Sequence, residues 1–121
     1  MELLRLAVTK LPADVEAALD RIAGEETEDA ARMQMKAITE NLKLAEASGT
    51  PLCQDTGVHI FYVKTGPATG DLDRIIRDGV RRGTNEIPLR PNAVHPMTRK
   101  NPGDNIGVNM PYLHYEPGDG K

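Results

Sequence analysis

The chain changes character at Thr50-Pro51-Leu52-Cys53-Gln54-Asp55-Thr56-Gly57, a stretch that holds its only cysteine. Pro51 fixes its own φ angle, and Gly57 permits backbone angles that other residues avoid. These features predict a short rigid loop, the kind of segment on which reactive groups are usually mounted. A lone cysteine is also often a small buried hydrophobe. Gln54 and Asp55 favour a functional cysteine, because two polar side chains beside a core cysteine would need hydrogen-bond partners of their own.

Before this loop the sequence predicts two helices. The segment Leu11-Pro12-Ala13-Asp14 opens the first helix, which runs to about Ala23 and carries an apolar stripe formed by Val15, Leu19 and Ile22. Thr27 is the predicted N-cap of a longer helix from about Glu28 to Ala47. Its predicted buried face consists of Ala31, Met35, Ile38, Leu42 and Ala45.

After the loop the pattern mixes strands with a helix. Residues 58–63 form a β-branched and aromatic run that predicts a strand, and residues 110–116 alternate like a second, half-buried strand. A turn is predicted at 66–70, followed by a helix that Asp71 caps and that runs to about Arg82. The stretch 117–120 resembles a hairpin turn, and 84–107 is a long loop rich in Pro, Asn and Gly. We therefore predict an α+β fold in which N-terminal helices pack against a small, mainly antiparallel sheet.

Length and composition predict a single soluble domain over residues 1–121, helical in 1–49 and mixed in 50–121. The chain is 39% hydrophobic and 27% charged, with a net charge of −3. A single cysteine excludes an internal disulfide, so nothing indicates secretion. The residues after Met1 lack the apolar core of a signal peptide, and no run approaches membrane-spanning length. We expect a cytoplasmic protein that does not bind membranes.

Basic side chains gather in one part of the second half. The segment from Arg74 to Lys100 has seven bases against two acids. Such an excess suits an anionic ligand, although a solvated helix face is the favoured interpretation for Arg74, Arg77 and Arg81. Nucleic acid is not expected as a partner, because no aromatic side chain lies among the arginines to stack on bases.

Several long motifs occur in a characteristic order. The Pro51–Gly57 stretch is followed by Arg81-Arg82-Gly83-Thr84 and Pro88-Leu89-Arg90-Pro91-Asn92, then by His95-Pro96-Met97-Thr98-Arg99-Lys100-Asn101, and finally by Asn105-Ile106-Gly107-Val108-Asn109-Met110-Pro111. Their order and spacing resemble the iron–sulfur hydro-lyase family of class I fumarases and L-tartrate dehydratases. The chain looks like the N-terminal part of the α subunit of the two-subunit form, and its fold would then be incomplete relative to the family domain.

The resemblance implies a 4Fe–4S cluster held by three cysteine thiolates, with Cys53 as the first ligand and one iron open as a Lewis acid. Gln54, Asp55 and Arg90 match residues of the family that contact substrate. The implied reaction is the reversible hydration of fumarate to malate, or the dehydration of tartrate to oxaloacetate. In it, Asp55 is the candidate catalytic residue, which accepts a hydrogen bond from the hydroxyl or water. Gln54 would donate to a carboxylate, and Arg90 would bind a carboxylate with both arms of its guanidinium.

The chain departs from the family in having one cysteine where the cluster needs three. We therefore expect it to bind no cluster and to be inactive alone. The resemblance places the other two cysteines in the remainder of the α subunit and the general base in a β subunit or domain. Besides these partners and the dicarboxylate, a homo-oligomer is expected, because an exposed sheet edge favours self-association.

A second hypothesis is a non-catalytic assembly module. It would keep the fold and use the basic segment Arg74–Lys100 to dock a partner subunit or an anion, with Cys53 buried and inert. His59, His95 and His114 are assigned no role, and a metal site made from these three histidines is not expected.

Overall fold

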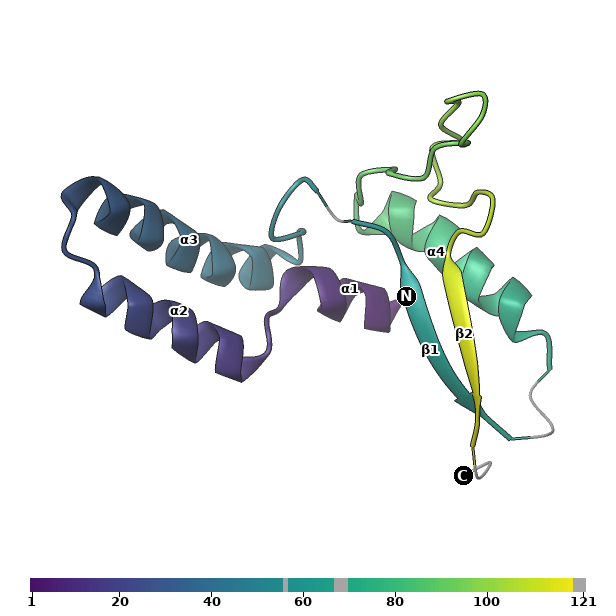
Figure 1. Ribbon diagram of the computed structural model, residues 1–121, viewed down its shortest axis with the longest axis horizontal. Coiled ribbons are helices and arrows are strands. Elements are labelled where there is room, and N and C mark those ends of the chain that lie inside the picture. Colours follow the sequence, from purple (N-terminus) through teal and green to yellow (C-terminus); the bar gives the residue numbers. More distant parts are fainter. Residues whose placement is uncertain (56, 67–69, 119–121) are drawn as a thin grey trace. The chain divides into compact units, whose positions relative to one another are not determined.

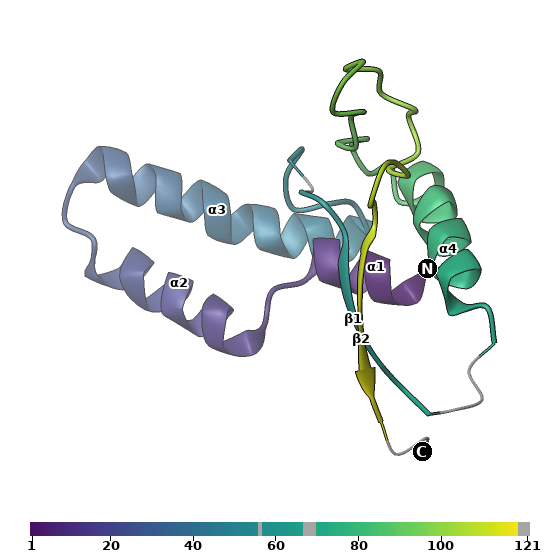
Figure 2. The ribbon, with the colours of Figure 1, turned by 45° about the vertical axis from the view of Figure 1, so that its right-hand side comes forward.

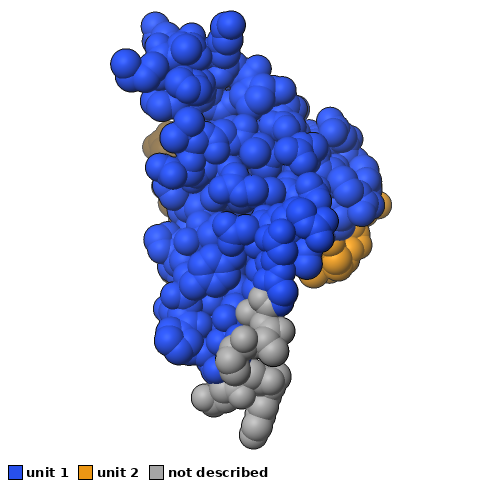
Figure 3. All heavy atoms as spheres, turned by 90° about the vertical axis from the view of Figure 1, so that its right-hand side faces the viewer, with its two compact units in different colours: residues 1, 54–121 blue, residues 2–53 orange. Residues whose placement is uncertain are grey.

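A computed structural model describes residues 1–55, 57–66 and 70–118 of the chain (Figure 1). The chain folds as two compact units, coloured separately in Figure 3. One comprises Glu2–Cys53, called the helical unit below, and the other comprises Met1 with Gln54–Lys121, called the mixed unit. None of the described helices is long and apolar enough to cross a membrane.

The helical unit consists of α1 (Glu2–Thr9), α2 (Ala13–Glu25) and α3 (Asp29–Ser48). The sequence predicted α2 and α3 to within two residues at each end, but it did not predict α1. Helices α2 and α3 lie side by side in both views of the ribbon (Figures 1 and 2). Burial in this unit is sparse, because no residue of α2 and only Ala45 of α3 is buried.

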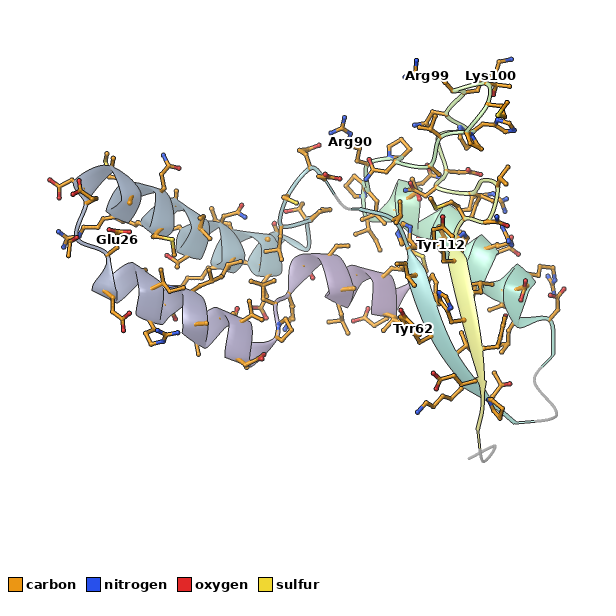
Figure 4. All side chains as sticks on the ribbon, viewed as in Figure 1. Glu26, Tyr62, Arg90, Arg99, Lys100 and Tyr112 are labelled. Carbon is orange, nitrogen blue, oxygen red and sulfur yellow. The ribbon has the colours of Figure 1, made fainter. Side chains whose placement is uncertain are left out.

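The predicted Thr27 cap is wrong. The N-cap position of α3 is Glu28, whose side chain makes no capping bond. Instead, the carboxylate of Glu26 accepts hydrogen bonds from the backbone N–H groups of Thr27 and Glu28, at 2.8 and 3.0 Å. Glu26 lies in the turn between α2 and α3 (Figure 4). Thr27 was expected to cap the start of α3, but here the side chain of Glu26 binds the backbone N–H groups of the turn before the helix.

The mixed unit contains β1 (Ile60–Thr65), α4 (Leu72–Glu86) and β2 (Tyr112–Pro117). Asp71 caps α4 as predicted, since its carboxylate accepts the N–H of Arg74 at 3.1 Å. The strands begin two residues later than predicted, and α4 continues four residues past its predicted end. Tyr62 of β1 stacks on His114 of β2 with ring centroids 5.0 Å apart.

The prediction of a mainly antiparallel sheet is wrong, because β1 and β2 are parallel. Their register runs from Ile60 opposite Tyr112 to Thr65 opposite Pro117. The predicted helix and loop do lie between the strands, but α4 and the irregular segment 87–111 carry the chain back, so β2 starts at the same end as β1 (Figure 2). Parallel neighbours require a long crossover of this kind. The predicted turns at 66–70 and 117–120 fall partly outside the described residues.

The core of the mixed unit lies beside the last turns of α4. Val80 is fully buried, and three side chains of the irregular segment join it: Ile87, Leu89 and Ala93. Two polar residues, Thr84 and Asn105, are buried with them at 5% and 3% exposure. The long loop expected at 84–107 therefore carries core residues of its own.

Candidate active site

The residue before Cys53 is fastened to two helices. Gly49 ends α3 in the left-handed conformation, at φ 65° and ψ 24°, which glycine adopts without steric cost. The N–H of Leu52 then donates to the carbonyl of Val8 in α1 at 2.9 Å. The side chain of Asn41 in α3 donates to the carbonyl of Leu52 at 2.8 Å. Both polar groups of the Leu52 backbone are thereby held, and Cys53 follows directly as an exposed residue.

Arg90 projects from a backbone that is anchored on both sides. Leu89 and Ala93 are buried at 3% and 2% exposure, and the N–H of Leu89 donates to the carbonyl of Thr84 at 3.1 Å. Between these anchors Arg90 is exposed. Figure 4 shows it on the irregular segment that follows α4, well away from Arg99 and Lys100 at the tip of that segment. An exposed guanidinium on a fixed backbone is suited to binding a carboxylate.

Asn105 is the buried centre of this segment. Its Oδ1 accepts the backbone N–H groups of Asn92 and Ala93, at 2.6 and 3.3 Å. Its Nδ2 donates to Thr84 Oγ1 and to the carbonyl of Arg90, both at 3.1 Å. One side chain thus satisfies four polar groups and fixes the backbone from 90 to 93 against α4.

Asn92 joins this segment to the loop after Cys53. Its Nδ2 donates to Asp55 Oδ1 at 3.3 Å and to the carbonyl of Gly57 at 2.9 Å. The same Asp55 oxygen also accepts the N–H of Gly57 at 3.4 Å. The structure therefore brings Asp55 and the Arg90 segment together within the mixed unit, whereas Cys53 belongs to the helical unit. Gln54 is exposed beside Asp55 in the chain.

The three histidines lie in different places: His59 directly before β1, His95 in the irregular segment and His114 in β2. Nδ1 of His95 accepts two backbone N–H groups of its own turn, from Met97 and Thr98. His59 is half-buried and its Nε2 has no hydrogen-bond partner among the described residues. Burial lowers the pKa of His59 below its ordinary value of 6.5. Across the described ranges, no three His, Cys, Asp or Glu side chains form a group that would hold a metal ion.

Comparison with known families gives a match over the whole chain. The family model for fumarate hydratase (Fumerase) matches residues 1–121. The chain belongs to the fumarate hydratase family. The predicted membership in the class I fumarase and L-tartrate dehydratase family, as the N-terminal part of an α subunit, is thereby confirmed.

Individual relatives agree with this assignment. A protein of Methanocaldococcus jannaschii, provisionally named as the α subunit of L(+)-tartrate dehydratase, is 43% identical over 121 residues, or 96% of this chain. A protein of Geobacillus stearothermophilus, provisionally named as a class I fumarate hydratase, is 35% identical over 89% of the chain. The L(+)-tartrate dehydratase α subunit of Escherichia coli K12 is 32% identical, also over 89%. The match spans 42%, 22% and 37% of these three proteins, respectively.

Cys53 suits one ligand position of the cluster that the sequence motif implies, but the chain does not offer a complete site. Thiolates are the ligands of iron–sulfur clusters, and an exposed cysteine on a fastened loop meets that need. The chain has no second cysteine. This member of the fumarate hydratase family therefore fits the cluster as a contributor of one thiolate.

Sequence reasoning missed Asn92 and Asn105, the two residues that join the Asp55 loop to the segment that carries Arg90. Both were visible only as parts of longer motifs. Asn105 has φ 58°, a left-handed conformation that asparagine tolerates better than most residues. An asparagine in a Pro- and Gly-rich loop is usually interpreted as a turn residue. The burial of Asn105 depends on contacts with Thr84 and Arg90, which lie 21 and 15 residues earlier in the chain.

Proposed function

We propose that this chain supplies part of the active site of a hydro-lyase that adds water to, or removes water from, a small dicarboxylate. The observation that carries the proposal is the hydrogen bond from Asn92 to Asp55. This bond joins the loop that carries Gln54 and Asp55 to the segment that carries Arg90. Gln54, Asp55 and Arg90 are the residues that the family resemblance assigns to substrate binding. The family match over the whole chain supports the same chemistry.

Each side chain has a role that its chemistry suits. The planar guanidinium of Arg90 binds one carboxylate of the substrate in a bidentate pair. Gln54 donates a hydrogen bond to a carboxylate. Asp55 accepts a hydrogen bond from the hydroxyl group or water molecule that is lost or added. In the hydration direction, the hydroxyl joins one carbon of the double bond and a proton joins the other.

A 4Fe–4S cluster with Cys53 as one of three thiolate ligands is part of this proposal. When bound, the cluster would supply an open iron as a Lewis acid for the oxygen of the substrate. The other two cysteines come from the remainder of the α subunit, and the general base comes from a β subunit or domain. The 121 residues alone are inactive under this proposal, because one thiolate does not hold the cluster.

Fumarate is the first substrate to be assayed and tartrate the second. Two of the relatives described above carry the name of L(+)-tartrate dehydratase and one that of fumarate hydratase. Both substrates present two carboxylates, which match the carboxylate-binding roles of Arg90 and Gln54. The assay therefore follows fumarate hydration and tartrate dehydration in parallel.

The alternative assembly module loses support, because the arginines of α4 are engaged locally. Arg74 pairs with Asp71 at 3.3 Å, and Arg82 pairs with Glu86 at 3.1 Å. Arg81 pairs with two acids, Asp78 at 3.0 Å and Asp104 at 3.1 Å. Three of the four arginines of this helix thus pair with neighbouring carboxylates, and the fourth, Arg77, donates to the carbonyl of Met110 at 2.8 Å, which weakens a docking surface for an anion.

The test is anaerobic iron–sulfur reconstitution of the chain alone and of the assembled protein with the remaining α segment and the β subunit. Optical spectra and both substrate assays follow. We expect a cluster and activity only in the assembled protein, and we expect Cys53→Ala to abolish both. Gln54→Ala serves as the matched control in the same loop, with the cluster retained and KM raised. An unchanged cluster and rate in Cys53→Ala would refute the ligand assignment.

A further inference from the structure

We propose that Asn92 is a positioning residue that holds the Asp55 carboxylate in its working orientation, and that Asn105 sets the position of Asn92. This inference rests on the proposed function, in which Asp55 contacts the hydroxyl or water. Neither asparagine touches substrate in that scheme. They act on the reaction by fixing the geometry of Asp55 relative to Arg90.

The Nδ2 group of Asn92 donates two hydrogen bonds. Both acceptors of its Nδ2, the Asp55 carboxylate and the Gly57 carbonyl, lack hydrogen atoms that they could donate. The amide orientation is therefore determined by its partners, since a flipped side chain would place its oxygen against two other oxygens. Asn92 thus contacts the loop on both sides of position 56 and restricts rotation of the Asp55 side chain.

Asn105 determines where that donor lies. It accepts the backbone N–H of Asn92 itself at 2.6 Å, and it donates to the carbonyl of Arg90 at 3.1 Å. The backbone that carries Asn92 and the backbone that carries Arg90 are therefore held by one buried side chain. A shift of the Asn105 side chain would therefore move two residues together: Arg90, which is proposed to bind the substrate carboxylate, and Asn92, which is proposed to hold Asp55.

Stability and positioning are separable at Asn92. Its two side-chain bonds lie at the surface, whereas those of Asn105 to Thr84 and Ala93 are buried. Loss of an exposed hydrogen bond changes stability little, because water replaces the partner. A small displacement of a catalytic group, by contrast, lowers the reaction rate strongly. Substitution of Asn92 is therefore expected to lower the rate while leaving the fold intact.

Asn101 provides a matched control. It also braces the irregular segment, with Nδ2 donating to the carbonyl of Pro91 at 2.7 Å and Oδ1 accepting the N–H of Gly103 at 2.8 Å. Its bonds are exposed like those of Asn92, but their partners are Pro91 and Gly103 and not Asp55. Alanine at either position removes an amide from the same segment, and aspartate at either position adds the same charge.

The experiment compares Asn92→Ala, Asn92→Asp, Asn101→Ala, Asn101→Asp and Asp55→Asn in the assembled enzyme. We expect both Asn92 variants to lower kcat by roughly tenfold to a hundredfold, the loss expected for a misplacement of about 1 Å. KM for fumarate should change much less, because Arg90 and Gln54 hold the carboxylates. Asn92→Asp keeps the size of the side chain but removes its donors, so packing alone would leave that variant active. The Asn101 variants should keep kcat close to that of the unsubstituted enzyme.

A second readout is independent of turnover. Hydrogen exchange of the backbone amides at 54–57 should become faster in both Asn92 variants and stay unchanged in both Asn101 variants, with equal melting temperatures throughout. If Asp55→Asn abolishes activity while the Asn92 and Asn101 variants behave alike, the positioning role is refuted and the proposed function stands. If Asp55→Asn retains full activity, the proposed function itself fails at Asp55.

Discussion

The two units of this chain achieve order in different ways. The helical unit consists of regular helices whose ion pairs are exposed and mostly link residues three or four apart, as in Arg5–Glu2 and Arg21–Glu25. The mixed unit has less regular structure, yet its segment 87–111 is held by buried side chains that bond to distant backbone groups. Exposed pairs of this kind contribute little to stability. A single substitution should therefore have its largest effect in the irregular part of the chain.

The largest effect is predicted for Asn105→Ala. The substitution leaves the N–H groups of Asn92 and Ala93 and the carbonyl of Arg90 without their partner, and it places alanine at φ 58°. Buried polar groups that lose their partner each cost about 1–3 kcal/mol, so we expect a loss of about 3 kcal/mol or more. Urea unfolding with hydrogen exchange of peptides from 87–111 measures the change.

Asn101→Ala is the control for this prediction, because its hydrogen bonds are exposed. It should cost no more than about 1 kcal/mol. If Asn105→Ala and Asn101→Ala lowered the free energy of unfolding equally, burial of Asn105 would not stabilise the mixed unit. That result would contradict the difference proposed between the two units.

An intermediate effect is predicted for two glycines of the helical unit. Gly49 has φ 65°, so Gly49→Ala should cost about 1 kcal/mol for the left-handed conformation. Gly24 lies within α2 and a Cβ there would meet nothing within 4 Å. Gly24→Ala should therefore stabilise the helix by roughly 0.5–1 kcal/mol. Thermal unfolding monitored by circular dichroism measures the stability of both variants. A change of the same sign in Gly49→Ala and Gly24→Ala would contradict the assigned backbone conformations.

The smallest effects are predicted on acidification, at different pH in the two units. Bonds from the N–H groups of Glu28 and Thr27 hold the pKa of Glu26 below its ordinary value of 4.5. Folding thus favours the ionised form, and this stabilisation is present above about pH 4.5 and lost as the pH falls through the lowered pKa. Burial lowers the pKa of His59, so folding favours neutral imidazole, and stability is lost as the pH falls below 6.5.

Hydrogen exchange as a function of pH measures this difference. The mixed unit should begin to lose protection below pH 6.5, and the turn between α2 and α3 only below about pH 4.5. Glu26→Gln should remove the acid dependence of that turn. Glu25→Gln makes the same change one residue earlier, where it breaks an exposed pair with Arg21, and should preserve the acid dependence. Loss of protection in both units at one common pH would contradict the assignment.

The sequence by itself determined the features that depend on near neighbours. The end of α3 was predicted to within one residue and Asp71 was predicted to cap α4, as it does, because a helix end is set by residues within one turn. The apolar stripes located α2 and α3, and the motifs identified the family. The local prediction failed at the start of α3, where the carboxylate of Glu26 binds the backbone N–H groups of Thr27 and Glu28 and Thr27 is not the N-cap.

Only the tertiary structure decided which distant residues meet. The parallel pairing of β1 with β2 depends on the path of the crossover through α4, which the alternation of side chains within a strand does not encode. The bond between Asn92 and Asp55 spans 37 residues, and it exists because Asn105 is buried against Thr84. Residue types and local spacing gave the candidates Gln54, Asp55 and Arg90. Asn92 connects their segments and the buried Asn105 holds Asn92. Both gain these partners only when the chain folds, which is why local pattern does not reveal them.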